Sequence, residues 1–189
     1  MKRRIRLVRY VMYKETLIDV KEHLWTFLGS FIGIATIGLL HSKHFSGIDN
    51  LFLIGSFGAS SVLIYGVINS PLAQPRNLIG GHVLSAIIGV SVHKLMPGEV
   101  WVSGALSVSL SIVLMQITKT LHPPGGATAL IANIGSEKIR NIGYLFVLTP
   151  VLSGVLILLV IALIVNNMTS HRSYPQNKKW YRIWKGYRR

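Results

Sequence analysis

The stretch His122-Pro123-Pro124-Gly125-Gly126, followed by the small apolar run at residues 127–134, decides how this chain can fold. It places helix-breaking residues directly before a membrane-like sequence. Proline lacks a backbone N–H group and glycine leaves its backbone exposed. Hydrocarbon tolerates them together only where protein or a water-filled cavity satisfies the freed polar groups. We therefore predict broken backbone at membrane depth, and with it a pathway or a binding site.

The composition is that of an integral membrane protein. Half of the 189 residues are hydrophobic and 14% are charged, whereas soluble domains have about 25% charged residues. The chain contains no cysteine, which excludes disulfides and cysteine-ligated clusters, and no cofactor is predicted.

Positive charge concentrates at the two ends. Of the 20 lysines and arginines, seven lie at positions 2–21 and seven at positions 172–189. We divide the chain into a basic amphipathic N-terminal segment (1–23), a transmembrane domain (24–166) and a basic, aromatic C-terminal interfacial tail (167–189). The charge bias predicts that both ends face the cytoplasm, with anionic lipid as the partner of both tails. A cell inner membrane is expected ahead of an organelle inner membrane, because no transit-like leader is recognisable.

Five apolar runs approach the roughly 20 residues that a helix needs to cross a bilayer. They cover residues 24–40, 51–69, 78–96, 101–118 and 143–166. Five crossings would place the basic tails on opposite sides, so residues 121–134 are predicted to form a sixth, broken segment. The predicted fold is an all-α bundle of five to six membrane-embedded helices, broken or re-entrant at the His-Pro-Pro-Gly-Gly motif. Four full spans with a re-entrant loop is the alternative.

A weak internal repeat gives the broken segment a counterpart. Residues 70–82 follow the second apolar run and residues 120–128 follow the fourth, and each stretch contains proline, a Gly-Gly pair and histidine. Paired interruptions of this kind in corresponding halves of a chain indicate the binding site of a transporter. The two stretches are predicted to face each other.

Three strings carry a resemblance to a known family. They are FGASSVLIYGV (57–67), SPLAQPRNLIGGH (70–82) and LHPPGGATALIA (121–132). In this order they closely resemble the HPP family of integral membrane proteins, named for its His-Pro-Pro motif, over about residues 24–165. The resemblance implies a four-span membrane protein that acts as a transporter, with nitrite as the substrate associated with plastid members. The five to six embedded segments predicted above depart from that span count.

The residues themselves favour an anion. A helix that begins after the glycine pair would point free N–H groups and its positive dipole end into the break. The nearby acids, Asp49, Glu99 and Glu137, belong to loops or lie beyond the break. The predicted binding residues are His122, Gly125, Gly126, Thr128, Arg76, Asn77, His82, Lys119 and Gln74, and the structural motif residues are Pro123, Pro124, Pro75, Gly80 and Gly81.

Structural roles could also explain these residues. Arg76 and Lys119 stand where inward-facing loops are expected, His122 could cap a helix, and the glycines could serve close helix packing. Small-residue pairs, such as Gly29 with Gly33 and Ser56 with Ser60, predict close helix contacts within a subunit or between subunits. A homo-oligomer is expected, because so small a chain commonly needs partners to enclose a pore.

Other functions fit less well. His41, His44 and Asp49 could bind a metal, but no third ligand is fixed by spacing, so a solvated loop is favoured and no metal site is predicted. No catalytic constellation is recognisable, and nucleic-acid binding does not suit basic residues that directly follow a span. We predict a transporter of a small inorganic anion, with nitrite as the best single guess. An anion channel and a non-transporting scaffold or assembly subunit are the alternatives.

Overall fold

The computed structural model describes residues 20–43 and 48–177, and all regular secondary structure within them is helical. The predicted all-α fold is confirmed. Residues 1–19 of the predicted N-terminal segment and residues 178–189 of the basic tail lie outside the described residues. The helices are α2 (Val20–Ser42), α3 (Ile48–Ser61), η1 (Val62–Gly66), η2 (Pro71–Ala73), α4 (Pro75–Leu95), α5 (Val100–Ile117), α6 (Pro123–Ile134), α7 (Glu137–Asn141), η3 (Val147–Leu152) and α8 (Ser153–Val165).

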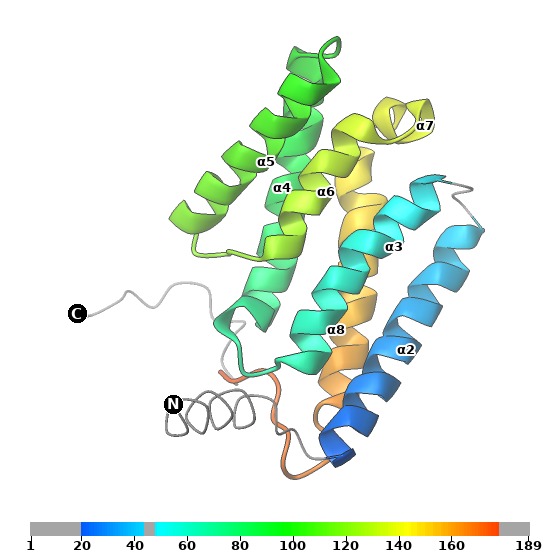
Figure 1. Ribbon diagram of the computed structural model, residues 1–189, viewed down its shortest axis with the longest axis vertical. Coiled ribbons are helices and arrows are strands. Elements are labelled where there is room, and N and C mark those ends of the chain that lie inside the picture. The colour runs from blue at the N-terminus through cyan, green and yellow to red at the C-terminus, as the bar shows by residue number, and fades with distance from the viewer. Residues whose placement is uncertain (1–19, 44–47, 178–189) are drawn as a thin grey trace, which may run out of the picture.

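The long helices run up and down one bundle, and the start of α2 and the end of α8 lie at the same end of it (Figure 1). Four described segments are long and apolar enough to cross a membrane unaided: α2, α4, α5 and the continuous stretch Val147–Val165. Helix α3 has 14 residues and is prolonged by the five of η1. Together they also run along the bundle (Figure 1).

Helix α6 is the short, broken member of the bundle. Its 12 residues span about 18 Å, well below a hydrocarbon core of about 30 Å. It begins at the His-Pro-Pro-Gly-Gly motif, as predicted, and packs between α4, α5 and α3. The predicted bundle of five to six embedded helices with a break at this motif is therefore confirmed.

A second break lies where the sequence predicted one continuous run. Thr149 adopts an extended conformation (φ −136°, ψ 118°) inside η3, directly before Pro150. Proline disfavours helical geometry in the residue before it and cannot donate a backbone hydrogen bond. The helix that ends in α8 is therefore kinked near its start.

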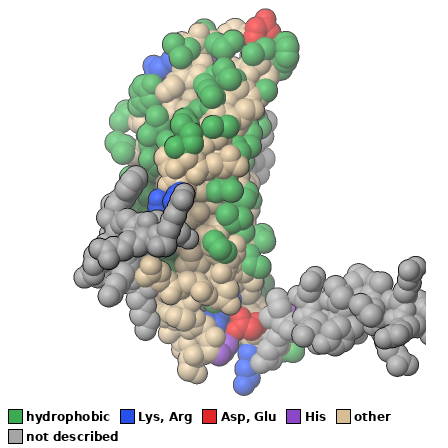
Figure 2. Space-filling model, turned by 90° about the vertical axis from the view of Figure 1, so that its left-hand side faces the viewer, with side chains coloured by type: hydrophobic (Ala, Val, Ile, Leu, Met, Phe, Trp, Pro, Cys, Tyr) green, Lys and Arg blue, Asp and Glu red, His purple; other side chains and the backbone are tan. Residues whose placement is uncertain are grey.

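The surface of the bundle suits a lipid environment. Hydrophobic side chains are spread along the face seen in Figure 2, and acidic ones appear near its two ends. Large apolar side chains such as Phe31, Trp101, Leu145 and Val160 are exposed. Lipid chains can surround these apolar side chains without a free-energy penalty, whereas their exposure to water would be unfavourable.

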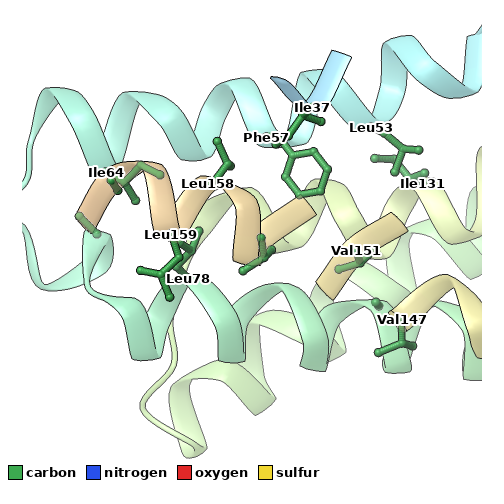
Figure 3. Packing of buried hydrophobic residues seen from close by; sticks show 14 of the residues in the cluster. Ile37, Leu53, Phe57, Ile64, Leu78, Ile131, Val147, Val151, Leu158 and Leu159 are labelled. Atoms are coloured by element: carbon green, nitrogen blue, oxygen red, sulfur yellow. The ribbon is translucent and has the colours of Figure 1, made fainter. Parts of the chain in front are cut away.

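The buried core joins α2, α3, α4 and α8. Figure 3 shows Phe57 of α3 beside Ile37 and Leu158, within a cluster that extends to Leu78 and Ile131. These side chains are all buried. The same cluster includes Ile131 of α6, so α4 and α6 both pack on this core.

Close glycine contacts seat α2 on this core. A side chain added at Gly29 or Gly33 would collide with the ring of Tyr65, whose hydroxyl donates a hydrogen bond of 3.2 Å to the backbone carbonyl of Leu158. The predicted close packing at this glycine pair is thus confirmed, and it lies within one subunit.

The first part of the C-terminal tail closes one end of the bundle. The buried Arg172 donates a hydrogen bond of 2.6 Å to the carbonyl oxygen of Tyr65 and pairs with Glu22 at 3.1 Å. Burial lowers the pKa of Arg172, and the charge of Glu22 acts in the opposite direction. Tyr174 is also buried, and its hydroxyl donates to the carbonyl of Ala73 at 2.7 Å. These bonds tie the tail to α2, η1 and the residues that precede α4.

Candidate functional site

The candidate site lies where α4 and α6 cross, which is the most extensive helix contact among the described residues. Glycines permit the close approach. A Cβ atom at Gly125 would lie 2.8 Å from both the carbonyl oxygen of Gly81 and the hydroxyl of Ser85. One at Gly89 would lie 2.5 Å from the carbonyl oxygen of Ala129. The glycines of the motif and of α4 therefore let the two backbones touch.

The two stretches of the predicted repeat face each other at this crossing. Thr120 packs on Gly80, and His122 packs on Gly81. Gly81 is six residues into α4, about 9 Å along the helix axis. His122 itself is extended (φ −141°, ψ 102°) and caps α6. The break thus lies beside the body of a spanning helix.

Side chains of α4 satisfy the carbonyl groups that the break leaves without helical partners. Arg76 donates from Nη2 to the carbonyl oxygen of Thr118 at 2.7 Å, and Asn77 donates from Nδ2 to that of Leu121 at 2.7 Å. Arg76 is exposed, whereas Asn77 is half-buried. Both residues were predicted to bind substrate, and in this structure they hold the broken backbone in place.

Two buried imidazoles meet at one hydroxyl. The Oγ atom of Ser60 lies 2.7 Å from Nε2 of His82 and 3.0 Å from Nε2 of His122. The other ring nitrogen of His122, Nδ1, donates to the carbonyl oxygen of Leu72 at 2.9 Å, because a carbonyl can only accept. Ser60 therefore connects α4 to the residue that caps α6.

The chain of contacts continues on the far side of His82. Its Nδ1 atom lies 2.7 Å from Oγ1 of Thr128, which lies 2.9 Å from Oγ of Ser56. Ser56 is 3.0 Å from the carbonyl oxygen of Pro124, to which it donates. We call the five side chains the histidine–hydroxyl network. All are buried, at 3% exposure or less: Ser56, Ser60, His82, His122 and Thr128.

Aromatic rings enclose one side of this network. The ring centroids of His82 and His122 are 5.0 Å apart, and Phe57 lies 5.6 Å from His82. His41 of α2 also contacts Phe57, at a centroid distance of 5.9 Å. The ring of Phe57 thus contacts both α2 and the network.

The remaining predicted residues have other positions. Gln74 donates to the carbonyl oxygens of Ile68 and Ser70, at 3.0 and 2.9 Å, and holds the loop before α4. Lys119 is exposed in the turn after α5, with a positive φ of 57°. Gly126 faces Val108 of α5. Of the residues predicted to bind substrate, the structure brings His82, His122 and Thr128 into the network.

The N-terminus of α6 has fewer free backbone N–H groups than the sequence analysis predicted. Pro123 and Pro124 have no N–H group, and the N–H of Gly125 already donates to the carbonyl oxygen of His122 at 2.8 Å. Three of the first four positions therefore cannot present a free N–H group to an anion. The polar side chains beside this helix end are the stronger candidates for binding.

Sequence reasoning missed the polar role of Ser56 and Ser60. The pair was interpreted as a packing motif, although two serines one turn apart on a buried helix also offer hydroxyls on one face. Nor do the site residues line the surface groove of about 550 Å³ found between α2, α3 and η1, which is bordered by residues such as Phe31, Ile34 and Val62. The network is instead packed shut between helices.

The described residues contain no candidate metal site, because no three of their histidine, cysteine or acidic side chains lie close together. His44, one of the three residues considered for a metal, lies outside the described part of the chain.

Comparison with known sequences identifies the family. The sequence profile described as "HPP, transmembrane region" matches residues 15–175. The chain belongs to this family. The resemblance carried by the three strings is therefore confirmed, and the protein is a multi-pass HPP-family membrane protein. The match covers every described helix.

Two relatives are transmembrane proteins of Dictyostelium discoideum. They are 51% and 48% identical to this HPP protein over 160 residues, which is 83% of this chain. The same region is 56% and 51% of the relatives, so the chain spans about half of their length. No solved structure shows significant similarity to it.

Removing the central hydroxyl tests whether the network holds the helices together. Ser60→Ala leaves both imidazoles without their shared partner, so it should destabilise the protein by about 1–3 kcal/mol. The matched control is Ser61→Ala, since Ser61 is buried next to it but its hydroxyl has no hydrogen-bond partner among the described residues. Unfolding in mixed detergent micelles measures both. Equal stability of the two variants would contradict the role given to Ser60.

Proposed function

We propose that this HPP protein moves a small inorganic anion across the membrane, with nitrite as the first candidate, along the crossing of α4 and α6. The observation that carries this proposal is the buried pair His82 and His122 beside a broken helix. Ionisable side chains inside membrane bundles are costly and usually serve a pathway or a relay. Packing alone would not require two imidazoles at this position.

The distribution of charge supports an anion rather than a cation. Three acidic side chains are described, and none contacts the histidine–hydroxyl network: Glu22 pairs with Arg172, Glu99 precedes α5 and Glu137 begins α7. The groups around the break are hydroxyls, imidazoles and the cations of Arg76 and Lys119. A chain with a formal net charge of +14 also favours the approach of anions.

Transport requires the crossing to open, because the network is packed shut. The proposed path begins at the end of α4 where Arg76 and Asn77 hold the break, and those two bonds would separate first. An anion entering there would meet His122 and then Ser60. Movement of α6 against α4 would expose the network alternately to each side; a channel that opens to both sides at once is the alternative mode.

Both ends of the chain are proposed to face the cytoplasm of a cell with the protein in its inner membrane. The basic tail that begins at Arg172 supports this orientation, and the turn between α4 and α5 lies at the opposite end of the bundle (Figure 1).

Cysteine labelling tests the orientation cleanly, because the chain has no cysteine of its own. Gly98→Cys in the α4–α5 turn should react with an impermeant maleimide added to intact spheroplasts. Ser173→Cys in the tail should react only after the membrane is opened. Both positions are exposed. The reverse pattern, or labelling of both from outside, would contradict the proposed orientation.

Anion flux into liposomes that contain the purified protein tests the function. Nitrite uptake should exceed that of protein-free vesicles and saturate, with nitrate, formate and chloride as competitors. His82→Gln and His122→Gln should each lower the initial rate about tenfold or more, because each leaves buried polar partners unmatched. His93→Gln, near the other end of α4, is the matched control and should transport normally.

Absence of protein-dependent flux for all four anions, from protein shown to be folded and inserted, would overturn the proposal. The scaffold function would then be favoured, and the search would turn to protein partners.

A further inference from the structure

The histidine–hydroxyl network contains more hydrogen-bond contacts than it has hydrogens when both imidazoles are neutral. Each hydroxyl carries one hydrogen and each neutral imidazole carries one, which gives the five side chains five in total. Ser60 Oγ also approaches the carbonyl oxygen of Ser56 at 3.3 Å, a longer contact that is left out of the count below. The six contacts of 3.0 Å or less need one hydrogen each. They join Leu72 O to His122, His122 to Ser60, Ser60 to His82, His82 to Thr128, Thr128 to Ser56 and Ser56 to Pro124 O.

The groups at the two ends of this row of contacts determine how many hydrogens are missing. Both end groups are backbone carbonyls, which can only accept. His122 must therefore donate its single ring hydrogen from Nδ1 to Leu72, and Ser56 must donate its hydroxyl hydrogen to Pro124. Three hydrogens then remain, those of Ser60, His82 and Thr128, for the four contacts between. One of these contacts in the neutral network therefore sets two lone pairs against each other.

We propose that this network binds one proton, which either imidazole can hold and which passes between them through Ser60. With the proton on His122, Nε2–H donates to Ser60, Ser60 donates to His82 Nε2, and His82 Nδ1–H donates to Thr128. Thr128 then donates to Ser56, and all six contacts are filled.

The second arrangement has the proton on His82 and fills the same six contacts. The proton on Nε2 of His122 moves to Oγ of Ser60 as the hydroxyl hydrogen of Ser60 moves to Nε2 of His82. The bonds to Leu72, Thr128 and Pro124 are unchanged. Ser60 ends with one hydrogen, as it began, so the step transfers one proton and leaves no other group altered.

Among the side chains that the structure describes, no opposite charge faces this proton. From α2, His41 contacts the ring of Phe57, which in turn contacts His82, and α3 presents hydroxyls. From α5, the uncharged Met115 faces Gly81 beside the rings, and α6 presents Thr128. The cations Arg76 and Lys119 lie toward the end of the bundle where α4 begins. The three described acidic side chains, those of Glu22, Glu99 and Glu137, make no contact with the network.

A buried positive charge without a partner is expensive, and no acidic side chain among the described residues provides the counter-charge. The anion of the proposed function supplies it. Proton and anion therefore enter the site together, as a neutral pair, and the protein couples anion movement to proton movement in the same direction. This coupling rests on the proposed transport, whereas the proton count of the network does not.

Two measurements separate these claims. The first follows the internal pH of liposomes with a trapped fluorescent indicator while nitrite is added outside and the membrane potential is clamped with potassium and valinomycin. Protein-free vesicles give the background from diffusing nitrous acid. We expect protein-dependent acidification that saturates with nitrite and falls at least tenfold in Ser60→Ala. Ser61→Ala is the matched control and should behave as the unmodified chain.

The second measurement needs no flux. Solid-state ¹⁵N NMR of histidine-labelled protein in bilayers reports whether each ring carries one hydrogen or two, and comparison with His82→Gln and His122→Gln assigns the signals. We expect a doubly protonated ring from this pair when nitrite is present, at a pH at which both rings are neutral without it.

The outcomes are distinct. Nitrite flux without proton movement, and with both rings neutral at every pH, would overturn the proton site and leave transport standing. A doubly protonated ring without any anion flux would support the proton site and overturn the transport proposal. Flux with acidification and the NMR change would support both.

Discussion

The structure depends on one constraint: hydrocarbon offers no water to a backbone that leaves the helical pattern. The motif that precedes α6 breaks the pattern, so every freed polar group needs a partner from the protein. Asn77 and Arg76 supply two of these partners from the first turn of α4, and His122 reaches back to the carbonyl of Leu72. The position of α4 is therefore set by the needs of the break as much as by apolar packing.

Close approach makes this compensation possible. Glycine at Gly80 and Gly81 removes the side chains that would otherwise hold Thr120 and His122 away from α4. The same approach brings the ring of His122 within 5.0 Å of the ring of His82. One feature of the sequence, a glycine pair on each side, thus produces both the packing and the polar network, and the structural and functional explanations of these residues do not compete.

Sequence alone predicted the bundle, the break and the facing repeats because each is encoded locally, by apolar run length and by proline and glycine. It did not predict which polar groups would meet. Ser60 is distant in sequence from both His82 and His122, and only the tertiary fold brings the three together. The kink at Pro150 was missed because it lies within a long, mostly apolar run, so run length outweighed a single residue. Arg76 was predicted from its charge to bind an anion. Its partner in the structure is a carbonyl freed by the break, and this pairing could not be predicted because it depends on the tertiary fold.

The most direct test of this account is a double-mutant cycle across the docked break. A Cβ atom at Gly80 would lie 2.5 Å from Cγ2 of Thr120, so Gly80→Ala should destabilise the protein when Thr120 is present and much less in a Thr120→Gly background. Unfolding in detergent micelles should give a coupling free energy of about 1 kcal/mol or more. If the two substitutions were additive to within about 0.5 kcal/mol, the broken segment would not rest on α4, and the account built on that contact would be wrong.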